Sequence, residues 1–172
     1  MIRKAVAADI PEIARIYDDI HTEEEAGRVT IGWIRSIYPT RKTAEAALEN
    51  GDLYVMEENG GIVAAARLNQ SQEPSYAKAD WTYDAEDAEV MVLHTLVVSP
   101  HGENQGYGKA FVLFYEDFAR KHGCKYLRMD TNQKNMRARK FYKKLGYSEV
   151  GIVPCVFNGI KGVSLVCLEK KL

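Results

Sequence analysis

A glycine-rich loop between an apolar run and an amphipathic stretch constrains this chain more than any other feature. Residues 89–98 (EVMVLHTLVV) are almost continuously apolar, which predicts a central strand buried on both faces. Beyond the loop at 99–106, aromatic residues recur at helical spacing and predict a helix over 107–122: Phe111, Phe114, Tyr115 and Phe118. Gly123 supplies the stop. A glycine-rich loop that leads from a strand into a helix places backbone N–H groups where they can hold a phosphate.

Short-range patterns along the chain predict an α+β order of elements. Apolar or alternating runs predict strands over 2–6, 52–58, 62–69, 89–98, 125–131, 147–157 and 162–169. Helical spacing predicts helices over 10–25, 30–37, 40–50, 107–122 and 138–145. Asp9, with Glu12 three residues on, offers an N-cap for the first helix. Residues 70–88 lack periodicity, and a connection of this length is often a binding loop.

Composition and charge narrow the classes of partner. The chain has 172 residues, which fits one domain over 1–172. Its formal net charge of -1 shows no basic excess, so no nucleic acid partner is expected. Its three cysteines match neither a metal spacing nor a disulfide framework, so we expect no metal and a reducing, cytoplasmic setting. No apolar run resembles a signal peptide or nears the roughly 18 residues that span a bilayer, so no membrane partner is expected.

Residues 105–110 (QGYGKA) form the candidate phosphate-binding turn. Glycines let a phosphate approach the unpaired N–H groups at the start of a helix. An ordinary glycine-rich turn is the alternative interpretation. A Walker loop does not fit, because Gly102 and Gly108 are one residue too far apart and Ala110 replaces the hydroxyl that would hold magnesium. A dinucleotide fingerprint does not fit either, because its third glycine is missing.

Two sequence blocks around this turn carry a family resemblance. Over 96–100, LVVSP resembles an L-x-V-x-P strand end, and QGYGKA over 105–110 fits Q/R-x-x-G-x-G/A. The second block, NMRA over 135–138 and FYKKLGY over 141–147, resembles N-x-x-A-x-x-x-Y-x-x-x-G-[FY]. In this order and at this separation, the blocks make residues 89–150 resemble the core of the GNAT superfamily of acyl-CoA N-acyltransferases. Pro100 and Gln105 lie further apart than is usual in that family, so the loop entry is expected to bulge outward.

The resemblance implies both a fold and an activity. The fold is α+β, with a central, mixed, mostly antiparallel, twisted sheet of about six to seven strands flanked by about four to five helices. The activity is that of an N-acetyltransferase, which moves an acetyl group from the co-substrate acetyl-CoA to a primary amine by direct attack in a ternary complex. A non-catalytic acyl-CoA-binding sensor is the alternative.

The resemblance also assigns residues to CoA. It places the pyrophosphate on the backbone of Gln105, Gly106, Tyr107, Gly108, Lys109 and Ala110. The pantetheine chain pairs with Leu96, Val97 and Val98 as an added strand, and an N–H near Val97 or Val98 polarises the thioester carbonyl. In this family the strand also splays from 125–131, which opens a slot for the thioester. Asn135 contacts CoA or caps its helix, and the two roles are compatible.

Two proton transfers remain, one off the amine and one onto the CoA thiolate. Tyr142 is the candidate acid by its place in the second block, and a core aromatic is the alternative. Glu89 and His94 are the candidate bases. They lie an odd number of residues apart, so a regular strand would point them to opposite faces unless a bulge intervenes. A satisfied core histidine, a solvated glutamate and a water relay without a single base are the competing interpretations.

The amine that accepts the acetyl group is expected to bind between the N-terminal helices and residues 70–89. Trp33, Tyr76 and Trp81 are the candidate lining residues, with ordinary packing as the alternative. Acids dominate 70–89, which favours a small-molecule or peptide amine with a positive charge, although a solvated acidic loop also fits. Exposed sheet edges near the C-terminus are compatible with either a monomer or a homodimer.

Overall fold

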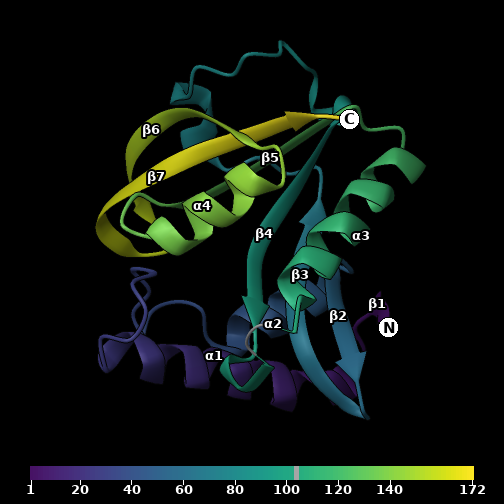
Figure 1. Ribbon diagram of the computed structural model, residues 1–172, viewed down its shortest axis with the longest axis vertical. Coiled ribbons are helices and arrows are strands. Elements are labelled where there is room, and N and C mark those ends of the chain that lie inside the picture. Colours follow the sequence, from purple (N-terminus) through teal and green to yellow (C-terminus); the bar gives the residue numbers. More distant parts are fainter. Residues whose placement is uncertain (103–104) are drawn as a thin grey trace.

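A single seven-stranded sheet organises the chain (Figure 1). The computed structural model describes residues 1–102 and 105–172, so part of the predicted loop over 99–106 lies outside the described residues. The strands are β1 (Ile2–Lys4), β2 (Leu53–Glu58), β3 (Gly61–Asn69), β4 (Val90–Val98), β5 (Tyr126–Asn132), β6 (Ser148–Phe157) and β7 (Ile160–Lys171). Their spatial order is β1-β2-β3-β4-β5-β7-β6, which confirms the apolar strand β4 as the central one.

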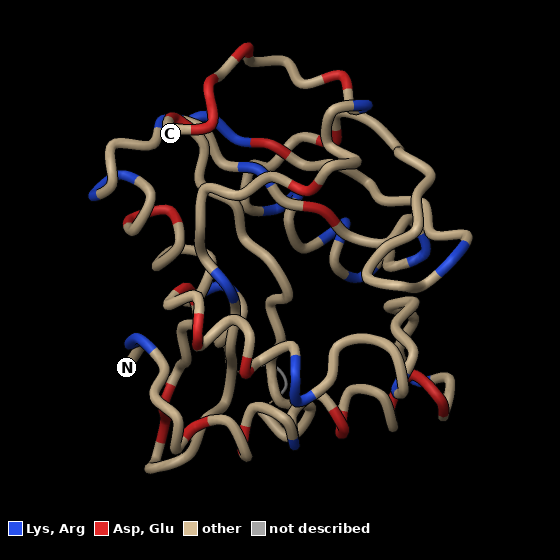
Figure 2. The backbone as a smooth tube through the Cα atoms, turned by 180° about the vertical axis from the view of Figure 1, so that it is seen from behind, with Lys and Arg blue, Asp and Glu red and all other residues tan. Residues whose placement is uncertain are grey.

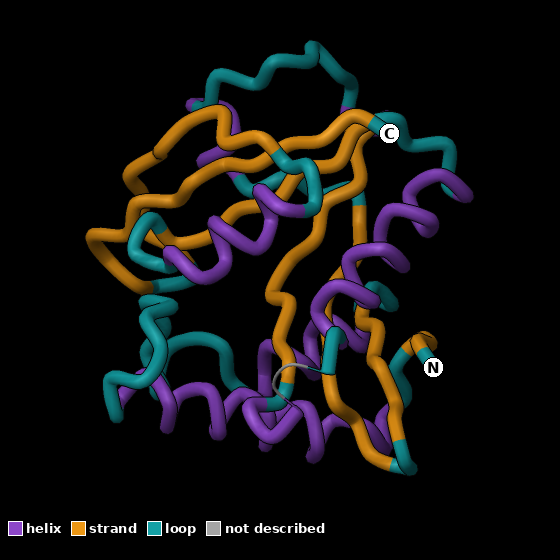
Figure 3. Tube along the Cα trace, in the orientation of Figure 1, coloured by secondary structure: helices purple, strands orange, loops and turns teal. Residues whose placement is uncertain are grey.

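Helices cover both faces of this sheet (Figure 3). They are α1 (Ile10–Glu25), α2 (Arg41–Glu49), α3 (Tyr107–Lys121) and α4 (Met136–Lys144). The aromatic stripe of α3 packs on one face with α4, where Phe111 and Tyr115 are fully buried. The other face buries Ile13 and Ile16 of α1 together with alanines of α2. The α+β class, the mixed and mostly antiparallel sheet and the four described helices agree with the prediction.

One predicted helix is wrong, and one predicted cap works differently. Residues 30–37 form no helix, because Gly32 takes a left-handed φ of 85° that interrupts one. The segment ends in a turn that is closed by an isolated bridge between Ile34 and Tyr38. Asp9 does not cap α1. Its carboxylate accepts from the Val6 N–H at 2.8 Å and from the guanidinium of Arg3 on β1, so it connects the start of α1 to β1 instead.

The pairing of β4 changes along its length. Its first half runs parallel to β5, from Val90 opposite Tyr126 to Leu93 opposite Met129, and there the pairing ends. Its second half pairs only with β3, on which Val97 lies opposite Ala65. Between these halves β4 carries a bulge at Thr95, whose φ of 52° is unusual for a β-branched residue. The strands β4 and β5 therefore diverge beyond Leu93, as the resemblance implies.

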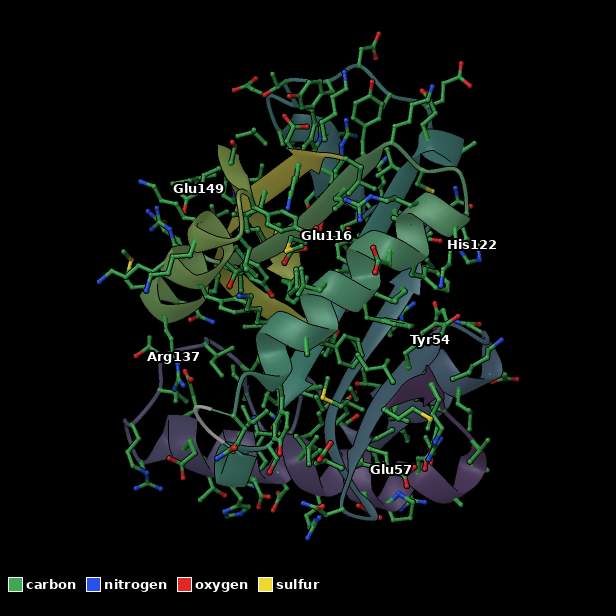
Figure 4. The ribbon with its side chains drawn as sticks, turned by 45° about the vertical axis from the view of Figure 1, so that its right-hand side comes forward. Tyr54, Glu57, Glu116, His122, Arg137 and Glu149 are labelled. Atoms are coloured by element: carbon green, nitrogen blue, oxygen red, sulfur yellow. The ribbon has the colours of Figure 1, made fainter. Side chains whose placement is uncertain are left out.

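A part-buried ion pair links α3 to β7. Glu116 projects from α3 toward the strands (Figure 4) and is only 5% exposed. Its Oε1 accepts from Lys170 Nζ of β7 at 2.8 Å and from the Tyr147 hydroxyl at 3.1 Å. Three segments that lie far apart in the sequence are thus joined at one buried carboxylate, and its removal leaves a lysine and a phenol without their partner.

We predict that Glu116→Ala lowers the free energy of unfolding by about 2–4 kcal/mol, because it removes a buried carboxylate that accepts from both Lys170 and Tyr147. Urea unfolding followed by circular dichroism measures this change. Asp117→Ala, on the exposed face of the same helix, is the matched control and should change stability by about 0.5 kcal/mol or less. Equal losses in the two variants would contradict a structural role for the Glu116 carboxylate.

Candidate functional site

A cavity of about 680 Å³ opens where β4 and β5 diverge. Its walls come from the second half of β4, the start of α3, the end of β5, α4 and the irregular segment before α2. Segments from both halves of the chain therefore meet around one hollow. The geometry predicted from the splayed strands is present, and it places most of the predicted residues together.

The start of α3 forms one end of the cavity. Gly106 precedes the helix with a φ of 77°, and Gly106, Tyr107, Gly108 and Lys109 line the wall. The first N–H groups of a helix have no partner inside it and carry a partial positive charge. Gln105 and Ala110 belong to the same turn, but they are not among the lining residues.

Basic side chains gather at this end. Lys109, Lys134 and Arg137 line the cavity, and Arg137 projects from the start of α4 toward the space above α1 (Figure 4). Figure 2 shows the wider pattern, with Lys and Arg clustered on the α4 side and acids along α1 and on the connection between β3 and β4. Helix N–H groups and nearby cations together make this end of the cavity suited to phosphate.

The edge of β4 that faces β5 forms the floor. Leu96, Val97 and Val98 all line the cavity, as predicted. The Ser99 N–H donates to Val63 O on the β3 side at 2.8 Å. Because successive N–H groups of a strand point to opposite edges, the Val98 N–H faces the cavity. An extended ligand can therefore hydrogen-bond to this edge as an added strand.

Tyr142 lies on the α4 side of the same cavity. It is 8% exposed, and within the described part of the chain its hydroxyl has no hydrogen-bond partner. Burial, with a smaller effect of the nearby Asp130 carboxyl, raises the pKa of the phenol well above its usual value, so the group stays protonated at neutral pH. Asn135, which also lines the cavity, accepts the Ala138 N–H at 3.0 Å, so its predicted capping role is confirmed.

The two candidate bases lie outside the lining of the cavity. Glu89 sits in a short 3₁₀ turn before β4 and pairs with Lys125 at 2.8 Å, which lowers the pKa of its carboxyl. His94 is buried on β4, with Nε2 2.9 Å from Asn69 Oδ1 and Nδ1 3.5 Å from Glu73 Oε1. The Thr95 bulge follows both residues, so it does not bring them to one face.

The predicted acceptor residues are divided. Trp33 lines the cavity and packs edge-on against Tyr38. Tyr76 is buried and does not line the cavity. Trp81 packs against the Arg128 guanidinium at a separate, shallower hollow, which Asp80 and Asp84 also line. Among the described residues of the main cavity, the acids are Glu23 and Asp130. Glu23 pairs with Arg28 at 2.6 Å. None of the described acids of 70–89 lines this cavity.

Asp130 lines the cavity, but the sequence analysis did not predict it as a site residue. Its Oδ2 accepts from the Tyr76 hydroxyl at 2.6 Å, and burial raises the pKa of the carboxyl to about 6. A signal was available: Asp130 sits near the carboxyl end of a strand next to a parallel neighbour, where ligands bind in many α/β sheets.

Gly32, in the segment after α1, lies very close to Asn132 at the end of β5, and both residues line the cavity. A Cβ on Gly32 would collide with Asn132 Nδ2, and the φ of Gly32 is left-handed. Its N–H is held by the Glu24 carboxylate at 2.9 Å. Only glycine fits this position, which brings the segment after α1 directly against the end of β5.

Sequence comparison identifies the family. Residues 12–147 match the model of the acetyltransferase (GNAT) family. The chain is 28% identical over 107 residues to the uncharacterized N-acetyltransferase YhfO of Bacillus subtilis (strain 168), and 29% identical over 112 residues to YdhI of the same organism. These matches cover 61% and 65% of this chain, but only 65% and 64% of the two relatives. The chain belongs to the GNAT acetyltransferase family.

Solved structures show the same fold. A GNAT acetyltransferase from Streptococcus agalactiae 2603 superposes with a TM-score of 0.82 at 24% identity, covering 100% of this chain and 95% of that one. The protein yncA from Salmonella typhimurium, solved with its cofactor acetyl-CoA, gives a TM-score of 0.70 at 20% identity over 100% of this chain and 93% of that one. Among the described residues, no helix is long and apolar enough to cross a membrane, and no cluster of His, Cys, Asp and Glu could hold a metal.

We predict that Gly108→Val weakens binding of CoA by about tenfold or more, a loss of about 1.4 kcal/mol, because the side chain grows into the wall between Phe141 and Val98. Gly108→Ala is the size control, since its Cβ would lie 3.5 Å from Phe141, an ordinary contact, and it should bind better than the valine variant. Calorimetric titration with CoA measures both. Unchanged affinity in a folded Gly108→Val protein would contradict the site.

Proposed function

We propose that this protein transfers an acetyl group from acetyl-CoA to a primary amine by direct attack in a ternary complex. One observation carries the proposal: the start of α3, the free edge of β4 and Tyr142 line the same cavity. Each feature suits a different part of one reaction. Family membership supports the reaction class, and the acetyl-CoA bound to the Salmonella protein supports the choice of acyl donor.

The proposed position of acetyl-CoA follows the charge of the cavity. The pyrophosphate lies on the N–H groups of residues 106–109, close to Lys109, Lys134 and Arg137. The pantetheine chain continues along the free edge of β4, and the thioester reaches the divergence of β4 and β5. The Val98 N–H then supports the ligand or polarises its carbonyl.

Tyr142 supplies the acid in this scheme. The amine nitrogen attacks the carbonyl carbon, a C–N bond forms, and the C–S bond breaks with its electron pair on sulfur. The protonated phenol donates to that sulfur and is reprotonated from the nitrogen of the adduct. Holding both substrates in one cavity supplies much of the remaining rate.

We predict that Tyr142→Phe lowers turnover by roughly 100-fold, because the ring is kept and the proton donor is lost. Thiol release from acetyl-CoA in the presence of a panel of primary amines measures the reaction. Tyr147→Phe is the matched control, because Tyr147 is also buried but its hydroxyl bonds to Glu116 outside the cavity, so turnover should be retained.

Wild-type turnover in Tyr142→Phe, under conditions in which chemistry limits the rate, would leave Tyr142 as a core aromatic. Tight acetyl-CoA binding without thiol release for any amine would instead favour a non-catalytic acyl-CoA sensor.

A further inference from the structure

We infer that Asp130 is the catalytic base, which holds the ammonium group of the acceptor and takes its proton, and that the acceptors are primary amines with an apolar body. This inference rests on the proposed acetyl transfer and assigns the residue and substrate class that the sequence left open. It follows from the position and hydrogen bonding of Asp130, the hydrogen bonds of His94 and the apolar side chains that line the cavity wall.

Asp130 occupies the first position of β5 beyond the divergence. The last pair between the two parallel strands joins Leu93 and Met129, so Asp130 is the next residue along β5 and no longer has a β4 partner. It lines the same cavity as Tyr142 and Val98. A nitrogen that attacks a thioester held on the edge of β4 would arrive next to this carboxylate.

The hydrogen bonding of Asp130 leaves one oxygen for a ligand. Tyr76 donates to Oδ2 at 2.6 Å and so fixes the orientation of the carboxylate. Within the described residues, Oδ1 of Asp130 has no hydrogen-bond partner. The side chain lines the cavity, so a ligand there can reach this oxygen. An ammonium group bound at Oδ1 would donate a hydrogen bond to this oxygen and neutralise the half-buried carboxylate.

Burial raises the pKa of Asp130 to about 6, and other titratable groups surround it. The titratable groups that influence Asp130, or are influenced by it, come from every surrounding element: Tyr38, Glu73, Tyr76, His94, Tyr142, Cys155 and Cys167. Burial raises the pKa of the three phenols and of both thiols, so the phenols and thiols are neutral at pH 6. Glu73 is held ionised by His94, which lowers the pKa of its carboxyl.

The hydrogen bonds of His94 exclude it as the base. Asn69 Nδ2 donates to the Asp52 carboxylate, and Asn69 Oδ1 accepts from the Ser71 N–H at 3.0 Å, so the amide orientation is fixed. His94 Nε2 must therefore donate to Asn69 Oδ1, while Nδ1 faces the carboxylate of Glu73. Neither nitrogen presents a free lone pair to the cavity.

The wall next to Asp130 is apolar. Trp33, Phe157, Val163 and Leu165 line the cavity there, and Tyr38 joins the two aromatic residues edge to face at 5.9 and 5.5 Å. Leu165 lies on β7 opposite Asn132, two residues beyond Asp130 along β5. A hydrocarbon group attached to the amine would lie against this wall while its nitrogen stays at the carboxylate.

The proton balance is complete without a further reactant. The acceptor enters as R–NH₃⁺ and gives one proton to Asp130, which leaves a lone pair on nitrogen. That pair forms the C–N bond, and the C–S pair departs on sulfur. The second proton of the nitrogen reaches the sulfur through Tyr142. The products are the acetamide R–NH–CO–CH₃, CoA thiol and one proton, which Asp130 releases to solvent.

Kinetics of the intact protein test the assignment, with 2-phenylethylamine and ethanolamine as acceptors and thiol release as the readout. In the wild type, kcat/KM should fall as the pH drops below about 6, because Asp130 becomes protonated. Asp130→Asn should lower kcat/KM by roughly 100-fold or more and remove this acid limb. The kcat/KM for 2-phenylethylamine should exceed that for ethanolamine by roughly tenfold or more, because only 2-phenylethylamine carries an apolar group that can pack against the apolar wall.

Two further variants separate the role of the carboxylate from general structural effects. Tyr76→Phe removes the hydrogen bond that lowers the pKa of Asp130, so the acid limb should move to higher pH while acetyl-CoA affinity is retained. Asp84→Asn removes an equal charge at the separate hollow and should leave both rate and pH profile unchanged. Thermal unfolding and acetyl-CoA titration establish that each variant is folded.

The possible outcomes are distinct. Wild-type rate and an intact acid limb in Asp130→Asn would overturn the inference and leave the acetyltransferase standing. An unshifted limb in Tyr76→Phe would also overturn it. Preference for ethanolamine would overturn the substrate class. A wild-type protein that binds acetyl-CoA but acetylates no amine would overturn the proposed function, and the role of Asp130 with it.

Discussion

The end of hydrogen bonding between β4 and β5, after Leu93 and Met129, is the constraint on which the rest of the structure depends. Before that point β4 is a buried central strand, held on both sides. Beyond it, β4 turns away through the bulge at Thr95, and one edge of its backbone is left without a strand partner. Exposed backbone edges are normally covered or blunted, so a free edge inside a cavity is suited to a ligand that pairs with it.

Charge divides the cavity in a way that matches two substrates. Helix N–H groups and the basic residues at the start of α4 favour an anion at one end. At the other end Asp130 stands against an apolar wall. The phenol of Tyr142 lies on the α4 side between these features, and burial keeps it protonated. In the proposed reaction, phosphate and amine therefore bind at opposite ends of the cavity, and the reacting groups meet where the strands diverge.

Local patterns predicted most of the fold because the sequence is locally consistent. The apolar run of β4, the aromatic stripe of α3 and the turn at Asn59-Gly60-Gly61 each specify one element with little dependence on tertiary context. The helix predicted over 30–37 is absent because contacts outside this segment set its conformation. The Glu24 carboxylate accepts from the Gly32 N–H, and Gly32 approaches Asn132 closely. No short-range pattern carries such information.

The site was predictable to the extent that it is built from one contiguous motif. Residues 106–109 were found because helix-start chemistry is visible in the sequence, and residues 96–98 because the family resemblance assigned them to CoA. Asp130 was missed because its role depends on strand order, on burial and on a hydrogen bond from Tyr76, which is 54 residues away along the chain. Glu89 and His94 have suitable chemistry, but only the structure shows that they do not line the cavity.

Amide hydrogen exchange with and without acetyl-CoA tests the central claim most directly, because it reports on the backbone groups that are said to hold the ligand. Residues 96–98 and the start of α3 at 106–109 should gain protection together, while residues 79–85 around the shallow second hollow should not change. Protection confined to residues 79–85, or no protection of the β4 edge under saturating acetyl-CoA, would contradict the account.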